Sequence, residues 1–595
     1  MRTFNRWIIA CLAALAFFAP LKFGAPVVTQ ALLYVPQNPA DWVLETWPNQ
    51  VGVMFIFGAL LWLVLDPRRV EARTDLLFVL PLLFLATQAL PTLHSINRQM
   101  SMDTLVHFAC CVLVFYTAAW YVRDGASAAW IFGGLSLATM LVCVAAMRQY
   151  FGGLQETREF AAVYLDPTKV PKDFLLRMTS NRPFAWFGGY PNALAGFLVI
   201  SMAPTLAWTW VRARGWNPGV KWVTLLLLGG IMVLCLVLTG SRGGFTAFGA
   251  MIVTALLCLI PEGRRRVFTI GTALVLLALL LFIGLRTGLI TKGLSSFQSR
   301  LDYWRGAVAI AHDHTWLGTG PGTFGSIYPK YKLAQSEDAQ LVHNNYLQMW
   351  SDSGVFAFMV FAALWAAAIK DAFRLTSQRR GDAAAIAVCA ALTGAAVHGL
   401  VDFDLYVPGI AIPAFLLLGT LQGLKELPSI QPVATREKGQ WLVAGLCAAV
   451  AGLVIWVESL SMTAGFLHNR AYEFLRTNPW AALQDARQAA HLTPLSAPYQ
   501  ATAGDVAVRL RLFDEATERY RTAIADDPYR ASYHWRLARV ETAAHGLNDD
   551  ALLELRRATL LNPTNERYRQ ELAEAEESVR QSSGGLLEST PAKGE

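Results

Sequence analysis

The sequence predicts a polytopic all-α membrane protein with about 12 to 13 transmembrane helices, followed by a soluble α-helical repeat domain. Of the 595 residues, 54% are hydrophobic and only 16% are charged, whereas soluble chains carry roughly 25% charged residues. Before about residue 455, apolar residues come in long blocks separated by basic or polar breaks. A block of about 20 apolar residues can cross the ~30 Å hydrocarbon core of a bilayer. The remaining residues have an ordinary charge content, which indicates a domain outside the membrane.

The apolar blocks predict thirteen membrane spans. They lie near 7–24, 51–65, 76–90, 105–122, 128–147, 192–211, 220–239, 245–260, 267–284, 355–370, 383–400, 406–424 and 441–457. The first block lacks a small-x-small cleavage site and leads into further spans. We therefore interpret it as an anchor and not as a signal peptide.

Basic residues gather at alternate ends of these spans, which predicts their orientation through the positive-inside rule. With the N-terminus inside, the cytoplasmic loops contain Arg2, Arg6, Arg68, Arg69, Arg73, Arg212, Arg214, Lys221, Arg264, Arg265, Arg266, Lys370, Arg374, Arg379, Arg380, Lys425, Arg436 and Lys438. The opposite short loops hold little more than Lys22, Arg98 and Arg242. We expect the two long loops, 149–191 and 285–354, and the C-terminal domain on this outer face.

The spans and the change in composition divide the chain into five segments. Residues 1–180 form the N-terminal transmembrane helices, and 181–425 form a second membrane region that includes the long outer loop 285–354. Residues 426–459 hold the last span, 460–581 form the repeat domain, and 582–595 form a disordered tail.

The C-terminal domain repeats itself with a period near 34 residues. Three sets of residues recur at this spacing: Pro494, Pro528 and Pro563; Tyr499, Tyr533 and Tyr568; and the pairs Ala516 with Ala551 and Ala523 with Ala558. This period resembles the tetratricopeptide repeat, in which stacked helix pairs form a concave surface for a partner. The characteristic Trp and Leu-Gly pair are absent, and an irregular helical domain is the alternative.

His343 opens the polar stretch His-Asn-Asn-Tyr-Leu that leads into the span at 355–370. If this stretch is helical, His343, Leu347, Trp350 and Gly354 share one face at the outer end of a membrane helix. A neutral imidazole there can accept a proton from a hydroxyl group. A capping or interfacial histidine is the alternative interpretation.

Three arginines on the predicted outer face are candidates for binding an anion. Arg242 lies in a very short hairpin, Ser-Arg-Gly-Gly, between two spans; Arg182 precedes the sixth span, and Arg300 lies in the long outer loop. Guanidinium groups bind phosphate oxygens through two parallel hydrogen bonds, so converging arginines suit a phosphate or a diphosphate. Snorkelling or an internal salt bridge is the alternative.

Several other motifs favour structural roles. Gly318, Gly320 and Gly322 lack the lysine and strand–helix setting of a nucleotide loop, so they predict a turn. Asp402 and Asp404 are more typical of helix capping than of a metal site. We interpret His312, Asp313 and His314 as surface residues. All eight cysteines lie inside apolar runs and predict packing rather than disulfides: Cys11, Cys110, Cys111, Cys143, Cys235, Cys258, Cys389 and Cys447. We find no pattern for nucleic-acid binding.

In this order and setting, the motifs resemble those of the O-antigen ligase/polymerase family of bacterial membrane glycosyltransferases. The matching pieces span roughly residues 180–420: Arg182 with Phe-Gly-Gly-Tyr-Pro-Asn192-Ala-Leu-Ala-Gly, Ser241-Arg242-Gly-Gly-Phe, the series Arg300, Trp304, Gly318, Gly320, Gly322 and Phe324, then His343-Asn344 with Leu347 and Gly354, and finally Asp402 and Pro408.

The resemblance implies transfer of a glycan from a polyprenyl-diphosphate carrier to an acceptor hydroxyl, on the periplasmic face of a bacterial inner membrane and without a metal or cofactor. Direct displacement of the diphosphate would invert the anomeric carbon. By position, His343 would act as the general base, and Arg242 and Arg300 would hold the diphosphate. Arg182, Asn192, Trp304 and Asn344 would contact substrate.

Three acceptors remain open: lipid A-core, a growing glycan, and a protein hydroxyl. Besides these substrates, the expected partners are membrane lipid and a protein that binds the repeat domain. Two alternatives belong to other classes of protein. One is a transporter of lipid-linked glycans, for which mid-span charges and inverted repeats are expected, and the other is an export scaffold that presents the repeats.

Overall fold

The computed structural model describes residues 2–32, 36, 38–64, 75–155, 157–159, 181–260, 271, 289–425 and 437–588, and these contain helices but no strand. The membrane region comprises α1 (Arg2–Lys22), η1 (Val27–Leu32), α2 (Pro39–Leu44), α3 (Asn49–Val64), α4 (Leu76–Leu93), α5 (Arg98–Tyr121), α6 (Gly125–Phe151), α9 (Pro191–Arg212), η2 (Ala213–Gly215), α10 (Pro218–Thr239), α11 (Arg242–Leu259), α13 (Leu289–Asp313), α14 (Phe324–Tyr331), α15 (Asn345–Gln378), α16 (Ala383–His398), η3 (Asp404–Tyr406), α17 (Pro408–Leu424) and α18 (Glu437–Phe474). The repeat region comprises α19 (Pro479–Leu492), α20 (Ala497–Arg509), α21 (Phe513–Asp526), α22 (Ala531–His545), α23 (Asp549–Leu561) and α24 (Glu566–Glu588).

The apolar helices confirm a polytopic all-α membrane protein. Nine described helices are long and apolar enough to cross a membrane, and three shorter apolar helices accompany them. Twelve of the thirteen predicted spans coincide with these helices; the span predicted at 267–284 lies, except for residue 271, outside the described residues. Helices suit this solvent because they satisfy their backbone hydrogen bonds internally.

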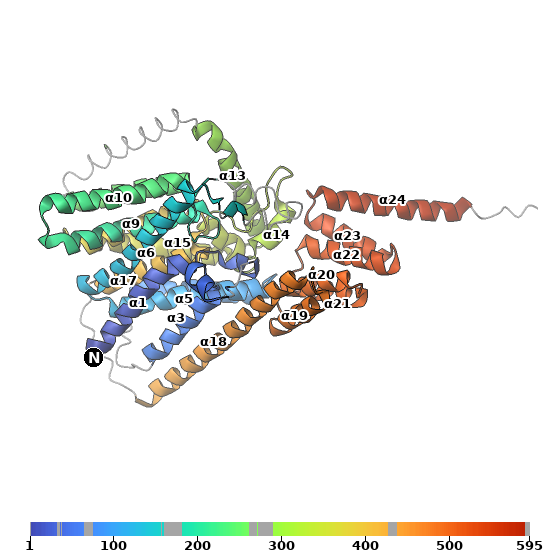
Figure 1. Ribbon diagram of the computed structural model, residues 1–595, viewed down its shortest axis with the longest axis horizontal. Coiled ribbons are helices and arrows are strands. Elements are labelled where there is room, and N and C mark those ends of the chain that lie inside the picture. The colour runs from blue at the N-terminus through green and yellow to red at the C-terminus, as the bar shows by residue number, and fades with distance from the viewer. Residues whose placement is uncertain are drawn as a thin grey trace, which may run out of the picture.

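Some helix backbones lie in close contact at positions where the residue is glycine. Helix α17 lies along α5 and is buried at every position (Figure 1). A Cβ added at Gly419 would lie 2.3 Å from the Phe115 carbonyl oxygen, and one at Gly423 would lie 2.0 Å from that of Val122. Small residues allow such close approach of backbones in membrane bundles.

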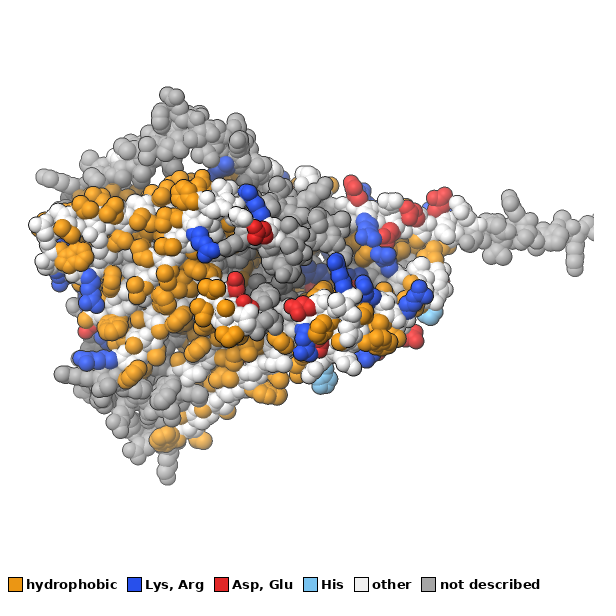
Figure 2. Space-filling model, viewed as in Figure 1, with side chains coloured by type: hydrophobic (Ala, Val, Ile, Leu, Met, Phe, Trp, Pro, Cys, Tyr) orange, Lys and Arg blue, Asp and Glu red, His pale blue; other side chains and the backbone are white. Residues whose placement is uncertain are grey.

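Other helices turn apolar side chains outward. Helix α10 exposes Trp222, Leu226 and Leu227, and α18 exposes Trp441 and Leu446. Figure 2 shows hydrophobic side chains covering the membrane region, with charged side chains gathered over the repeat region. An exposed apolar surface of this extent is what a bundle surrounded by lipid requires.

The repeat region stacks its helices in sequence beside one end of the bundle (Figure 1). Equivalent positions of the predicted repeat are buried alike: Tyr499, Tyr533 and Tyr568 are each 7 to 8% exposed, and Ala516 and Ala551 are fully buried. This agreement supports a helical repeat, while its assignment to the tetratricopeptide class stays a prediction.

The structure differs from the predicted boundaries in three places. Much of the loop predicted at 285–354 is helical, since it contains α13 and α14. Helix α18 runs without a break through the boundary at 459/460, so the last span and the repeat region share one rigid element. Helix α24 continues to Glu588, into the segment predicted as a disordered tail from residue 582.

Candidate active site

The predicted site residues gather at the end of the bundle that faces the repeat region, called here the site end. The backbone N–H of Asn345 donates to the Gly399 carbonyl at 2.8 Å, which joins the start of α15 to the α16–α17 loop. A Cβ added at Gly243 would lie 2.6 Å from Val401, so the start of α11 packs against the same loop. A Cβ at Gly196 would lie 2.5 Å from Asp404 Oδ1, which adds α9.

His343 does not lie on a helix, so the prediction that it shares a face with Leu347, Trp350 and Gly354 is wrong. Helix α15 begins at Asn345, and the Asn344 side chain caps it by accepting hydrogen bonds from Tyr346 N and Leu347 N. His343 precedes this cap and has a φ of +56°. An L residue in this region is strained, and the surrounding contacts hold the imidazole away from the helix face.

Aromatic rings and a carboxylate fix the His343 imidazole. It stacks on Tyr303 with ring centroids 5.7 Å apart and meets the edge of Phe403 at 4.7 Å. Its Nδ1 lies 3.2 Å from Asp402 Oδ1, and the imidazole side chain remains 18% exposed. The site therefore holds the ring in one orientation while leaving part of it accessible.

Asp402 is buried and ionised. Burial alone would raise its pKa, but the hydrogen bond from His343 and the charges of His343, His398 and Arg300 together lower the pKa of Asp402 below its ordinary value. A carboxylate only accepts hydrogen bonds, so Nδ1 of His343 carries a hydrogen, and in the neutral form of the imidazole the lone pair is then on Nε2. This tautomer is the one a general base needs.

Asp402 also joins the histidine to an arginine. Arg300 on α13 places NH2 3.8 Å from Asp402 Oδ2, and its side chain is 14% exposed. The single carboxylate therefore lies between the imidazole and the guanidinium, and the structure brings together two of the three residues predicted to be catalytic.

Arg182 lies against the ends of α9 and α10. Its Nε donates to the Thr239 carbonyl at 2.6 Å, and its NH2 donates to Asn192 Oδ1 at 3.2 Å. Burial lowers the pKa of Arg182, and the positive charges of Arg300 and Arg242 lower it further. The Arg182 guanidinium is thus close enough to Arg300 and to Arg242 to be repelled by their charges.

Arg242 begins α11 directly after its N-cap, Ser241. Its side chain is partly exposed, and within the described ranges it forms no side-chain hydrogen bond or ion pair. The positive end of the α11 dipole adds to its charge. Arg242 is therefore available for an anion at the site end.

Trp304 and Asn344 support the His343 segment. Trp304 Nε1 donates to the His343 carbonyl oxygen at 3.4 Å, and the Asn344 side-chain oxygen is engaged in capping α15. These contacts give both residues a structural role, and their predicted contact with substrate stays a prediction.

The glycine loop is a turn, in line with the structural interpretation. Gly318, Gly320 and Gly322 all have positive φ, and Gly322 N–H donates to Asp352 Oδ2 at 2.9 Å. A Cβ at Gly320 would lie 2.1 Å from Ser95 Oγ. The loop consequently fits between α15 and the α4–α5 turn only because its three glycine positions lack side chains.

Sequence reasoning missed the positioning residues around His343, of which Asp402 is the clearest. Asp404, interpreted as a cap, instead lies 2.6 Å from His398 Nδ1. Burial raises the pKa of Asp404, and the charge of Asp402 adds to this, although His398 opposes it. The spacing His398, Asp402 and Asp404 was the available signal. Among the described residues, no group of three or more His, Cys, Asp or Glu side chains could hold a metal ion.

The fold and this site define a polytopic membrane protein with an imidazole, a carboxylate and three guanidinium groups at one end of its helix bundle. Residues 223–362 match the family model described as O-antigen ligase, so this part of the chain is similar to that family. The match includes Arg242, Arg300 and His343 and supports a membrane glycosyltransferase of the ligase or polymerase type. A search of curated proteins finds no match.

Proposed function

We propose that this protein transfers a glycan from a polyprenyl-diphosphate carrier to an acceptor hydroxyl at the site end, on the periplasmic face of the inner membrane. The observation that carries the proposal is the shared carboxylate of Asp402, which holds His343 at 3.2 Å and Arg300 at 3.8 Å. Asp402 thereby holds the proposed base, His343, and the positively charged group of Arg300 within one small site.

The charge of the site suits a diphosphate. Arg182, Arg242 and Arg300 supply three positive charges, Asp402 removes one, and the His398–Asp404 pair neutralises itself within the bundle. The remaining two positive charges balance the two negative charges of a diphosphate diester. Guanidinium groups placed where charge develops stabilise the departing diphosphate more than the bound substrate.

His343 supplies the base. Its Nε2 accepts the proton of the acceptor hydroxyl while the hydroxyl oxygen forms a bond to the anomeric carbon. The bond from that carbon to the diphosphate oxygen breaks, and polyprenyl diphosphate leaves with the electron pair. Asp402 stabilises the resulting imidazolium, and attack opposite the leaving group inverts the anomeric carbon.

The test is a transfer assay with purified protein, a lipid-linked oligosaccharide and candidate acceptors, without added metal. We expect His343→Ala and Arg242→Ala to lose transfer. The controls are His312→Ala and Arg305→Ala, because both side chains are exposed on α13 and lie outside the site.

Transfer by His343→Ala or Arg242→Ala at the parental rate would overturn these roles. Transfer that needs a divalent ion would direct attention to Asp402 and Asp404. Supplying lipid A-core, glycan and protein acceptors in parallel distinguishes a ligase, a polymerase and a protein glycosyltransferase.

A further inference from the structure

A cavity of about 90 Å³ lies between the membrane bundle and the repeat region. His343, Arg182, Arg242 and Arg300 are not among the residues that line it. Helices α3, α5 and α18 form one side of it, and the α19–α20 and α21–α22 connections form the other. A second, smaller cavity of about 20 Å³ shares Asn49, Gln50 and Asp103 with the first and extends towards Glu458. The two cavities are neighbours because they share these residues, and together they are called here the recess.

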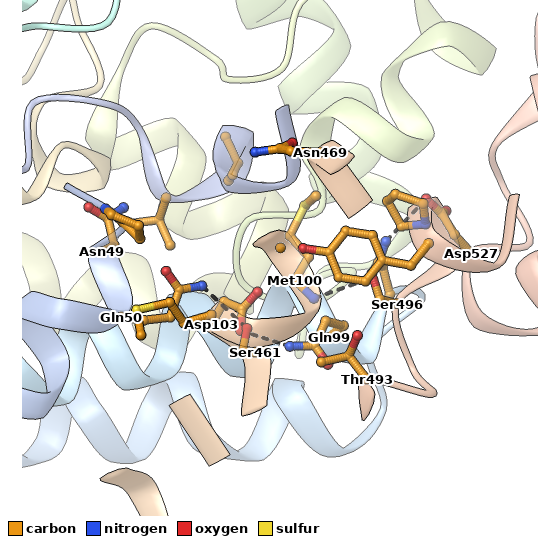
Figure 3. Close-up of a pocket in the computed structure, with 18 of the residues that line it drawn as sticks. Asn49, Gln50, Gln99, Met100, Asp103, Ser461, Asn469, Thr493, Ser496 and Asp527 are labelled. Carbon is orange, nitrogen blue, oxygen red and sulfur yellow. Dashed lines mark hydrogen bonds between the residues drawn. The ribbon is translucent and has the colours of Figure 1, made fainter. Parts of the chain in front are cut away.

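Most of the residues that line the larger cavity carry amide, hydroxyl or carboxyl side chains, and apolar atoms complete the lining of both cavities. Figure 3 shows the side chains of α3, α5 and α18 meeting in it, with Gln50 Nε2 donating to Ser461 Oγ at 3.3 Å and Gln99 Nε2 donating to Asp103 Oδ1 at 2.9 Å. The single basic residue among the lining residues of the larger cavity, Arg530, is paired with Asp527 at 3.3 Å. This charge distribution disfavours a phosphate and favours an uncharged polar ligand.

Buried polar atoms without protein partners lie at both ends of the larger cavity. Asn49 is 6% exposed, and neither its Oδ1 nor its Nδ2 has a hydrogen-bond partner. Asp527 is 1% exposed, and its Oδ1 likewise has none, although its Oδ2 accepts from Asn97 and Ser326. Such groups destabilise a fold unless something completes their hydrogen bonding.

A ligand with neighbouring hydroxyl groups can complete the hydrogen bonding of these buried atoms. One hydroxyl donates to the Asn49 oxygen while the next accepts from its nitrogen, and a third donates to the Asp527 carboxylate. Tyr499 and Pro498 add apolar surface to the lining, against which the carbon face of a sugar ring can pack. At roughly 15 Å³ for each water-sized group, the cavity has room for about six such groups, on the order of one sugar ring.

We propose that this recess binds an uncharged sugar unit of the glycan and holds the chain beside the transfer site. The identification of the ligand with the transferred glycan rests on the proposed function, whereas the recess itself does not. The glycine loop packs against the recess: Ile96, beside the recess, donates its N–H to the Thr319 carbonyl at 3.0 Å, and a Cβ at Gly322 would lie 3.4 Å from Met100.

The experiment measures binding and not transfer. The probe is an oligosaccharide that mild acid releases from the polyprenyl-diphosphate carriers of the bacterium that produces the protein. It is labelled at its reducing end. Its fluorescence anisotropy is followed with full-length protein in detergent. We expect Asn49→Leu to weaken binding at least tenfold, since the size is kept and the amide is lost. The matched control, Met100→Leu, keeps an apolar lining residue apolar and should change the Kd less than twofold.

Further measurements distinguish a loss of binding from a loss of folding and from a loss of transfer. Ser461→Phe fills the recess from α18 and should also abolish binding, and the thermal midpoint of each variant in the same detergent reports folding. Arg242→Ala should bind the probe with an unchanged Kd even though it fails to transfer, and inorganic pyrophosphate should not displace the probe.

Unchanged binding by folded Asn49→Leu and Ser461→Phe would overturn the recess as the glycan site, as would displacement by pyrophosphate or no binding by the parent protein. Each of these outcomes leaves the proposed function standing. Conversely, loss of binding in Asn49→Leu together with full transfer by His343→Ala would contradict the proposed function while supporting the recess.

Discussion

Asp402 Oδ1 lies 3.2 Å from His343 Nδ1, although the two residues are 59 positions apart in the chain. The contact joins the loop between α16 and α17 to the residue that precedes α15. It orients the imidazole, selects its tautomer and stabilises its protonated form, so one carboxylate supports the base at each stage of the proposed transfer.

Asp402→Asn tests this support. The amide keeps the size of the side chain but loses the charge, so we expect kcat to fall by about 10²-fold or more. The KM for the lipid-linked donor should change less than kcat, because Asp402 affects the diphosphate only through Arg300, which lies 3.8 Å away. Steady-state kinetics separate the two quantities. A raised KM with an unchanged kcat would assign Asp402 to donor binding instead.

The arginines should act on the donor. Arg242→Lys retains the charge but loses the two parallel hydrogen bonds, so kcat/KM for the donor should fall by about 10-fold, and Arg242→Ala should cost about 100-fold. The measurement varies the donor at saturating acceptor. Equal activity of the lysine variant and the parent would show that a point charge is sufficient there.

Gly320→Ala tests the fit of the glycine loop. Gly320 and Gly381 both have positive φ, but a Cβ at Gly320 would lie 2.1 Å from Ser95 Oγ, whereas one at Gly381 meets nothing within 4 Å. We expect Gly381→Ala to cost about 1 kcal/mol through its backbone and Gly320→Ala to cost about 1–3 kcal/mol more through overpacking. Thermal midpoints of the purified variants measure the difference, and equal midpoints would contradict the close fit.

The pH dependence of stability should contain a contribution from Asp526. Burial raises the pKa of Asp526 to about 6, with the neighbouring Asp527 carboxylate adding to the shift and Arg98 opposing it. Its ionised form therefore destabilises the folded protein above about pH 6, and this effect disappears as the pH falls towards the ordinary value of 3.8.

Asp526→Asn should consequently stabilise the protein at pH 8 by about 1 kcal/mol, after allowance for the partial exposure of the side chain. The same substitution should have almost no effect near pH 4. Thermal midpoints at the two pH values provide the test, and a stabilisation of equal size at both would exclude the carboxyl titration as its cause.

The amino-acid sequence predicted the spans well because a long apolar block such as 220–239 has few alternatives to a membrane helix. It missed α13 and α14 within the predicted loop, since neither is uniformly apolar and a search by hydropathy passes over them. Figure 1 shows α14 between the bundle and the repeat region, and α13 rising along the upper edge of the bundle.

The site was predicted in its residue types but not in its contacts. His343, Arg242 and Arg300 carry chemistry that can be recognised in a sequence, whereas the role of Asp402 depends on a loop closing against the start of α15. The helical face predicted for His343 was wrong because Asn344 caps α15 one residue later. Local patterns do not encode such tertiary relationships.

The most direct test of the central claim, that His343 and Asp402 act as one unit, is a double-mutant cycle on the rate of a single turnover. The rates of His343→Ala, Asp402→Asn and the double variant are compared with that of the parent protein. We predict that the double variant is no slower than His343→Ala, because Asp402 has no base left to support. Losses that multiply in the double variant would show that the two residues act independently and would contradict the account.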